Sequence, residues 1–249
     1  MDNPFSLEGK KILVTGASSG IGYETCRRIN LQGGTFIATA RREKNLEKLL
    51  LECNNSNHSA IRADIADDKE IDQLVNNLNG IDGIVHSAGI VSLAPVKYYN
   101  DDLLNSMRSV NYDSIVKIVN LLSKRNKLNR NGSIVLISSI SALFGMNGNG
   151  IYAGTKGALI SIAKVWANEL SRLRIRVNCV SPGMVKTDIT NRSIDDLSLE
   201  VVQNDQKKYP LGYGEPEQVA NPIIFLLSDA SSWITGQNLI LDGGRTACI

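Results

Sequence analysis

Short apolar runs alternate along the whole chain with longer segments that show helical spacing of apolar residues. Two of the runs, IVLIS at 134–138 and DGIVHS at 82–87, lack the polar alternation of a half-exposed strand. Such runs are typical of strands in a parallel sheet that helices cover on both faces. The pattern predicts an α/β fold with a doubly wound, seven-stranded parallel sheet. The predicted strands are Lys11–Thr15, Thr35–Thr39, Ala60–Ala63, Gly83–His86, Ser133–Ile137, Arg176–Val180 and Asn238–Leu241.

The clearest helical patterns lie between these strands, at Glu70–Leu78, Asp102–Leu122 and Ala153–Leu173. Polar stretches at Asn54–Asn57 and Asn129–Gly132 predict turns. The segment 187–214 is polar, poorly periodic and follows the end of a predicted strand. We therefore expect it to form a lid over a ligand crevice within one domain that spans residues 1–249.

Composition narrows the functional classes. The 249 residues carry 27 basic and 25 acidic side chains, a net charge of +2 at pH 7, which argues against a nucleic-acid or membrane-surface partner. The first residues lack the basic and apolar regions of a secretory signal, and no apolar run reaches the ~18 residues of a membrane span. Four scattered cysteines and two histidines make a metal site improbable. We expect a cytoplasmic enzyme without a metal.

A glycine-rich turn follows the first predicted strand directly and leads into a helical segment. It reads Thr15-Gly-Ala-Ser-Ser-Gly-Ile-Gly22. Glycines at this place allow a tight turn and let phosphate oxygens approach the N–H groups at a helix N-terminus. The alternatives are a glycine-rich turn without a ligand, and an ATPase phosphate loop, for which the required Gly-Lys-Ser/Thr is absent.

The end of the second strand indicates which nicotinamide cofactor is bound. An acidic residue there would hydrogen-bond the adenosine ribose, but the chain has Ala40 followed by Arg41 and Arg42. A guanidinium group matches a phosphate monoester, so the sequence favours NADP(H), with Arg41 carrying most of the preference. Alternatively, both arginines begin a solvated helix.

Tyr152 and Lys156 lie four residues apart in a helical pattern, so both project from one face. Ser139, at the carboxyl end of the fifth strand, precedes Tyr152 by thirteen residues, whereas Ser138 should point the other way. A lysine charge ~5 Å from the phenol, at an effective dielectric constant of ~20, contributes about 3 kcal/mol, which would lower the tyrosine pKa by roughly two units. The tyrosine could then donate a proton to a ketone, and Ser139 could stabilise the developing alkoxide.

Taken together, these motifs resemble the short-chain dehydrogenase/reductase family over essentially the whole chain. The resemblance covers Thr15–Gly22, Asp64, Ala88-Gly89, Asn111, Ser139, Tyr152, Lys156 and Pro182-Gly183. It implies a single Rossmann-type domain with Ser139, Tyr152, Lys156 and Asn111 as catalytic residues. The cofactor-binding residues it implies, with the arginines above, are Gly16, Ser18, Ser19, Gly20, Ile21, Gly22, Arg41, Arg42, Asp64, Ile65, Ala88, Gly89, Tyr152, Lys156, Pro182, Gly183, Val185 and Thr187.

The resemblance also implies individual roles. Asp64 would contact adenine, or else cap the helix that starts near Asp67. Lys156 would bind the nicotinamide ribose, and Asn111 would hold a water near Lys156 unless it is only a helix kink or a core amide. Val185 would meet the carboxamide and Thr187 the pyrophosphate, unless the segment is an ordinary Pro-Gly turn.

The chain departs from the family pattern in two places. Ser19 stands where some NADP-dependent relatives have a basic residue. His86-Ser87-Ala88-Gly89 replaces the usual Asn-Asn-Ala-Gly, and we expect His86 to pack or brace the turn instead of acting in catalysis.

The resulting hypothesis is an NADP(H)-dependent carbonyl reductase, nearest in pattern to 3-oxoacyl-acyl-carrier-protein reductases. Keto-sugar, polyol and steroid dehydrogenases share the same core, and a non-catalytic NADP sensor is the rival from another class. A methyltransferase is disfavoured by Ala40, and a serine hydrolase by the lack of a Gly-x-Ser-x-Gly motif. The family usually forms homotetramers, or homodimers. Two basic clusters could dock an acyl carrier protein beside the active-site mouth, or simply complement helix dipoles. They comprise Lys124, Arg125, Lys127 and Arg130, and Arg172, Arg174 and Arg176.

Overall fold

The computed structural model describes residues 3–187 and 199–247. Its sheet has seven parallel strands in the order β3-β2-β1-β4-β5-β6-β7, which confirms the predicted doubly wound α/β fold. The strands are β1 (Lys11–Thr15), β2 (Thr35–Ala40), β3 (Ser59–Arg62), β4 (Ile81–His86), β5 (Leu128–Ile137), β6 (Arg176–Pro182) and β7 (Asn238–Leu241).

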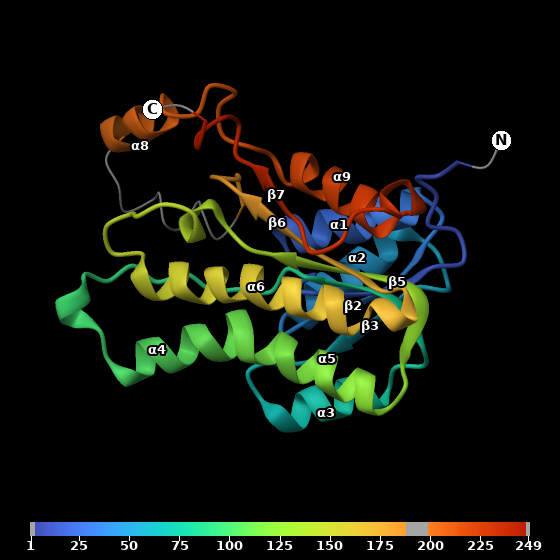
Figure 1. Ribbon diagram of the computed structural model, residues 1–249. Helices are drawn as coiled ribbons and strands as arrows, with labels where there is room; N and C mark the ends of the chain where they lie inside the picture. The colour runs from blue at the N-terminus through green and yellow to red at the C-terminus, as the bar shows by residue number, and fades with distance from the viewer. Residues whose placement is uncertain (1–2, 188–198, 248–249) are drawn as a thin grey trace.

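Helices cover both faces of this sheet (Figure 1). One face carries α3 (Asp68–Asn76), α5 (Ser114–Lys124) and α6 (Gly150–Glu169). The other carries α1 (Gly20–Leu31), α2 (Glu43–Cys53) and α9 (Pro216–Leu227). Beyond the layers lie α4 (Asp101–Arg108) and α8 (Leu199–Gln206), together with the short turns Val96–Tyr98, Ile140–Ala142, Ser171–Leu173 and Asp229–Ser231.

The two helical layers explain why the strand sequences show no polar alternation. In β5, Ile134 and Leu136 pack into the core below α5 and α6, whereas Val135 and Ile137 pack into the core below α1 and α9. Successive side chains of a strand point to opposite faces, so a strand buried on both faces must be apolar at every position.

One local prediction is wrong. The stretch Asn129–Gly132 is not a turn but part of β5, and it pairs irregularly with the start of β4. Asn129 donates to Asp82 at 2.9 Å, and Asn131 adopts a φ of 59°, so polar contacts and one left-handed residue accommodate this pairing. The helical pattern over 102–122 is confirmed by α4 and α5, which are joined by a π-helical turn at Ser109–Asp113.

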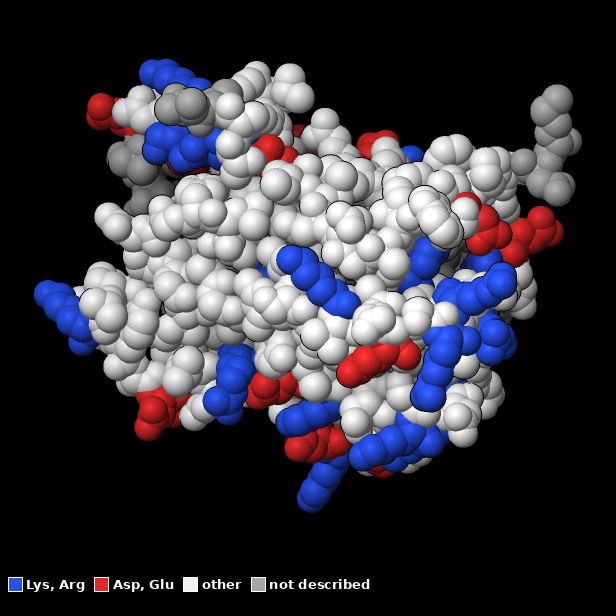
Figure 2. All heavy atoms as spheres, viewed as in Figure 1, with Lys and Arg blue, Asp and Glu red and all other residues white. Residues whose placement is uncertain are grey.

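Basic side chains gather at the end of the molecule where α5 and α6 finish (Figure 2). This is the amino-terminal edge of the sheet, because Leu128 and Arg176 begin β5 and β6 there. Several of these cations bind other parts of the chain. Arg125 pairs with Asp72, and Lys127 donates to the carbonyls of Val75 and Asn76. Arg176 donates to main-chain carbonyls at the end of α9. The expectation that these clusters lie beside the active-site mouth is therefore wrong.

Within the described ranges, no helix is both long enough and apolar enough to cross a membrane.

Candidate active site

A cleft of about 700 Å³ opens at the carboxyl ends of β1–β4, where the strand order reverses between β1 and β4. Ligands of open α/β sheets bind at such switch points. The cleft brings together most of the predicted cofactor residues, namely Gly16, Ser18, Ser19, Gly20, Ile21, Arg41, Arg42, Asp64, Ile65, Ala88, Gly89 and Thr187. Sequence reasoning did not anticipate its other lining residues, among them Ser87, Ile90, Val91 and Leu93.

The glycine-rich turn has no room for larger residues. A Cβ on Gly16, whose φ is +70°, would lie 2.6 Å from the backbone nitrogen of Ala88. A Cβ on Gly22 would lie 2.5 Å from the carbonyl oxygen of Gly16. The turn leads into α1 at Gly20, and the Ser19 side chain forms no cap hydrogen bond with this helix. The first N–H groups of α1 thus remain for an anion, which fits the pyrophosphate of a dinucleotide.

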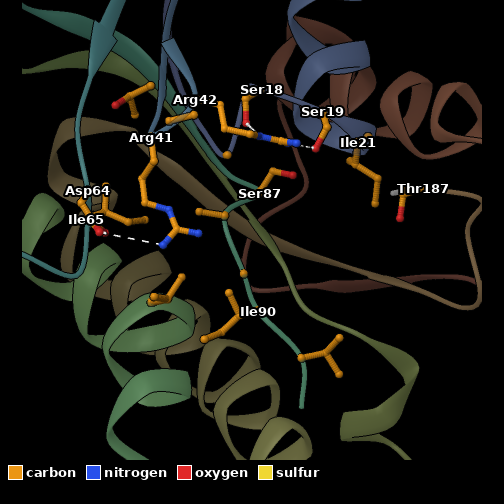
Figure 3. A pocket seen from close by; sticks show the side chains of 18 of the residues that line it. Ser18, Ser19, Ile21, Arg41, Arg42, Asp64, Ile65, Ser87, Ile90 and Thr187 are labelled. Atoms are coloured by element: carbon orange, nitrogen blue, oxygen red, sulfur yellow. Dashed lines mark hydrogen bonds and ion pairs between the residues drawn. The ribbon is translucent and has the colours of Figure 1, made fainter. Parts of the chain in front are cut away.

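The two arginines after β2 point in different directions (Figure 3). Arg41 extends toward Asp64, with its Nη1 3.9 Å from Oδ2. Arg42 reaches back to the glycine-rich turn, where Nε donates to Ser18 Oγ at 3.1 Å and Nη2 donates to Ser19 Oγ at 2.5 Å. Both line the cleft, so neither only begins a solvated helix.

Asp64 is not the cap of the helix that follows it. Asp67 takes that place, because its carboxylate accepts from the backbone nitrogens of Lys69 and Glu70 at the start of α3. Asp64 instead lines the cleft with Ile65, and its Oδ1 accepts from Ala66 N at 3.0 Å.

Ser139, Tyr152 and Lys156 meet where the carboxyl end of β5 packs against the first turns of α6. The Lys156 ammonium is buried, donates to the carbonyl of Ile137 at 2.8 Å and lies 5.7 Å from the centroid of the Tyr152 ring. The Tyr152 phenol shares a hydrogen bond with the Ser139 hydroxyl. Ser139 Oγ also accepts from the backbone nitrogen of Ser141 at 3.1 Å. Three side chains that can donate or accept a proton therefore lie close together.

The expected lowering of the Tyr152 pKa is wrong. Burial raises the pKa of Tyr152, and the hydrogen bond with Ser139 only opposes that rise. Burial also disfavours the charged form of Lys156 and lowers its pKa to about 8, while its ammonium donates to the carbonyl of Ile137. The phenol is therefore protonated at neutral pH, which is the state of a proton donor.

Asn111 is fully buried and lies in the π-helical turn. Its Oδ1 accepts from Ile90 N at 2.8 Å, and its Nδ2 donates to Ile90 O at 3.0 Å and to Thr155 Oγ1 at 3.1 Å. A Cβ on Gly89 would lie 3.3 Å from Lys156 Nζ and 3.4 Å from Asn111 Oδ1. Asn111 thus ties the loop after β4 to α6 beside Lys156, and it is a satisfied core amide as well as a neighbour of the site.

His86 is fully buried at the end of β4 and braces the turn beyond it. Its Nδ1 lies 2.9 Å from Thr15 Oγ1, which in turn accepts from Ala88 N at 3.3 Å. Burial, assisted by the nearby Lys156 charge, lowers the pKa of His86 to about 3. A side chain that stays neutral at any ordinary pH agrees with the expected bracing role.

The segment after β6 follows the same edge of the sheet. Pro182 ends β6, and Gly183 N donates to Leu241 O at 2.9 Å. Val185 is buried, and Thr187 lines the cleft beside Gly20. Of the predicted lid over 187–214, residues 188–198 lie outside the described residues, so the lid stays a prediction.

Three contacts of the site escaped sequence reasoning. Ser138 Oγ donates to the carbonyl of Lys156 at 2.8 Å, which joins β5 to α6, and Thr155 Oγ1 donates to Tyr152 O at 2.8 Å. Asn149 Nδ2 donates to Ser141 Oγ at 2.9 Å. Small polar residues near a strand end were the available signal, but only the packing of α6 on β5 identifies their partners.

Comparison with known proteins adds an independent finding. A family model described as Enoyl-(Acyl carrier protein) reductase matches residues 16–246. A 3-oxoacyl-[acyl-carrier-protein] reductase of Thermotoga maritima is 34% identical over 245 residues, covering 96% of this chain and 98% of that protein. An L-xylulose reductase of Bos taurus is 32% identical over 244 residues, covering 97% and 98%.

Solved structures are similar over nearly their whole length. One described as a short chain dehydrogenase/reductase family protein has a TM-score of 0.86 at 29% identity and covers 98% of this chain and 100% of that one. Another, from Agrobacterium tumefaciens with bound NADP and provisionally described as a 2-deoxy-D-gluconate 3-dehydrogenase, has a TM-score of 0.89 at 27% identity and covers 99% and 100%.

Proposed function

This chain belongs to the short-chain dehydrogenase/reductase family of NAD(P)-using oxidoreductases that act on CH–OH groups, and we propose that within it the chain is an NADP(H)-dependent carbonyl reductase. The observation that carries the proposal is the meeting of Ser139, Tyr152 and Lys156 at the carboxyl end of β5. These groups can bind a carbonyl oxygen and protonate it, which a dinucleotide sensor does not require.

The bound nicotinamide would supply a hydride to the carbonyl carbon. Tyr152, whose raised pKa keeps the phenol protonated, donates its proton to the carbonyl oxygen. Ser139 donates its hydroxyl hydrogen to the same oxygen, because its own Oγ already accepts from Ser141 N. Lys156 would bind the nicotinamide ribose and stabilise the phenolate that remains.

The residues at the mouth favour an acyl substrate. Leu93 and Val96 after β4, and Leu143 and Met146 after β5, all expose large apolar side chains. A hydrogen bond of 2.8 Å from Ala94 N to Gly148 O holds these two loops together. An apolar rim suits the alkyl part of a 3-oxoacyl group, and it offers few partners for a polyhydroxylated substrate. We therefore propose 3-oxoacyl-[acyl-carrier-protein] reduction, as in the relatives of that name.

A keto-sugar or polyol is the second candidate. The observation in its favour is that L-xylulose reductases match this chain about as well as the 3-oxoacyl reductases do, at 32% against 34% identity. A steroid substrate would suit the apolar rim but has no relative among those compared above to support it.

Assembly into a homotetramer or homodimer is also proposed. It is supported by β7, which lies at the edge of the sheet and exposes Leu239 and Ile240, and by Trp233, which is 98% exposed. Edge strands with exposed apolar residues are rarely left open. Light scattering of the purified protein measures the assembly directly.

The decisive experiment follows NADPH oxidation with a panel of 3-oxoacyl thioesters, keto-sugars and simple ketones. We expect the 3-oxoacyl thioesters to have the highest kcat/KM. A preference for keto-sugars would support the second candidate. NADPH binding without turnover of any carbonyl would overturn the enzymatic proposal and favour a sensor.

A further inference from the structure

The segment after β7 turns back at the carboxyl edge of the sheet and carries an arginine there. Asp242, which directly follows β7, is buried, and its carboxylate accepts from Gly244 N at 3.0 Å and from Thr246 N at 2.6 Å. Gly243 and Gly244 adopt φ values of +59° and +87°, in the left-handed region that favours glycine. These contacts fix the backbone on both sides of Arg245.

The guanidinium group of Arg245 contacts two aromatic rings from other segments. Its Cζ lies 5.1 Å from the centroid of the Phe144 ring and 5.9 Å from the centroid of the Tyr209 ring. Phe144 belongs to the loop after β5 that also contains Ser139. Tyr209 follows α8 and packs against Gly183, because a Cβ on that glycine would lie 2.9 Å from Tyr209 Cε1. Cation–π contacts thus hold the guanidinium between segments that follow β5 and β6.

The order of the strands places this cation on the side of the catalytic residues. β5, β6 and β7 are consecutive in the sheet, and the last residues of β6 and β7, Pro182 and Leu241, are paired (Figure 1). Neighbouring strands lie ~4.8 Å apart, so the ends of β5 and β7 are about 10 Å apart. Arg245 starts beyond β7 yet reaches a ring in the loop after β5. Its side chain therefore extends past the end of β6 toward the loop of Ser139.

Arg245 has donors to offer a ligand. Within the described ranges, its guanidinium forms neither a salt bridge nor a hydrogen bond with the protein. Asp242 does not neutralise it, since both carboxylate oxygens accept from the backbone of their own turn. The side chain is half-buried, so part of its hydration is already lost. A guanidinium in this state favours a carboxylate or a carbonyl oxygen, to which its N–H groups can donate.

We propose that Arg245 is a specificity-determining residue that binds a second oxygen acceptor of the substrate, separate from the carbonyl that is reduced. This acceptor is the thioester carbonyl of a 3-oxoacyl group or the carboxylate of an oxo acid. The inference rests on the proposed carbonyl reduction and deepens it: the apolar rim takes the alkyl chain, and Arg245 recognises the polar group beside the ketone. Simple ketones lack that group.

The test compares three substrates that differ at this group. They are the 3-oxohexanoyl thioester of a small thiol, 3-oxohexanoate, and 3-hexanone, in which a methyl group replaces the carboxylate. Steady-state oxidation of NADPH gives kcat and KM for the wild type, for Arg245→Met and for the matched control Arg130→Met. Methionine keeps an apolar chain against the two rings, and Arg130 is exposed at the opposite edge of the sheet.

We expect Arg245→Met to raise KM about 10- to 100-fold for the thioester, the oxo acid or both, as for a lost hydrogen bond to a charged group. Because Arg245 does not transfer the proton, kcat should stay within about 3-fold, and KM for 3-hexanone should change less than about 2-fold. An effect on the oxo acid alone identifies a carboxylate as the ligand, and an effect on the thioester alone identifies its carbonyl. Arg245→Lys should lie between the wild type and Arg245→Met.

Thermal unfolding shows whether each variant retains the fold, and the wild type supplies a measurement that depends on no variant. Its kcat/KM for the thioester or the oxo acid should exceed that for 3-hexanone at least about 10-fold. Equal kcat/KM values for all three substrates would overturn the inference while carbonyl reduction stands. An equal rise in KM for all three in Arg245→Met would also overturn it, and would assign Arg245 to the packing of the two rings. Reduction of no carbonyl at all would overturn the proposed function.

Discussion

Tyr152 holds its proton at neutral pH because burial raises the pKa of the phenol, and this decides how the residue can act. We predict that Tyr152→Phe lowers kcat for carbonyl reduction about 10²- to 10⁴-fold, since only the proton donor is removed. NADPH affinity should be nearly unchanged. Single-turnover reduction and NADPH titration measure the two effects separately.

Lys156→Ala is the informative comparison for this variant. If Lys156 binds the nicotinamide ribose as proposed and stabilises the phenolate of Tyr152, its loss should impair both turnover and NADPH affinity. Substantial reduction by Tyr152→Phe, or a Lys156→Ala protein with normal cofactor affinity, would contradict these assignments.

His86 gives a prediction on stability. Its pKa is about 3 in the folded protein against 6.5 in an ordinary environment, so between these values the unfolded chain binds the additional proton. Stability is therefore lost as the pH falls below 6.5. Between pH 6.5 and pH 5 the loss from His86 alone is about 2 kcal/mol. Lys156 is the charged group that reinforces this shift, and it stays protonated throughout that range.

We expect His86→Asn to lose about 2 kcal/mol less than the wild type when the pH is lowered from 7 to 5. Urea unfolding at both pH values measures the difference, and His58 is present in both proteins and cancels. An identical pH dependence of the two proteins would show that His86 can be protonated without unfolding.

At the scale of elements, the π-helical turn between α4 and α5 places Asn111 against the loop after β4. The amide satisfies both backbone groups of Ile90, so Asn111→Ala leaves them unpaired in a buried place. We predict a loss of about 2–4 kcal/mol in the free energy of unfolding, together with a lower kcat, because the same loop carries Gly89 beside Lys156. Urea unfolding and steady-state kinetics measure the two.

Asn105→Ala is the matched control, since Asn105 is exposed on α4 of the same continuous helix. Asn111→Asp keeps the acceptor for Ile90 N and should lie between the wild type and Asn111→Ala. A loss in Asn105→Ala as large as in Asn111→Ala would mean that helix propensity, not the buried amide, accounts for the effect.

The strands and helices differ in how far their own sequences predict them. All seven strands and the glycine-rich turn were predicted. In the central strands, burial on both sheet faces leaves an apolar run that few other structures produce. The π turn was missed because one additional residue hardly alters the spacing of apolar residues. The polar start of β5 resembles a turn, since its stabilising partner, Asp82, is remote in sequence.

For the site, the spacing of Ser139, Tyr152 and Lys156, together with their place after the fifth strand and the family resemblance, predicted that the three residues meet. It did not reveal the direction of the Tyr152 pKa shift, which depends on burial and on the hydrogen bond with Ser139. Nor did it distinguish Arg41 from Arg42. Adjacent residues at the end of a strand point in different directions, and only the folded structure shows which of the two contacts the glycine-rich turn.

At the scale of the whole molecule, the distribution of charge decides where a carrier protein could bind. The basic clusters after α5 and α6 lie at the edge of the sheet opposite to the cleft. Exposed lysines do occur near the mouth. Lys97 lies between β4 and α4, and Lys207 follows α8, two residues before Tyr209, which packs against Gly183.

If the substrate is a 3-oxoacyl group on an acyl carrier protein, the lysines at the mouth should attract its acidic surface. We predict that Lys97→Glu combined with Lys207→Glu raises KM for the carrier-bound substrate about 5-fold at low salt, and that the effect fades as salt screens the charges. The same acyl group on a small thiol should show no change. Arg130→Glu combined with Arg172→Glu, both exposed at the opposite edge, is the control and should leave both substrates unaffected. A larger effect from the control pair would place docking at the edge opposite to the cleft and contradict this prediction. Equal effects on the carrier-bound substrate and on the small thiol substrate would exclude charge-guided docking.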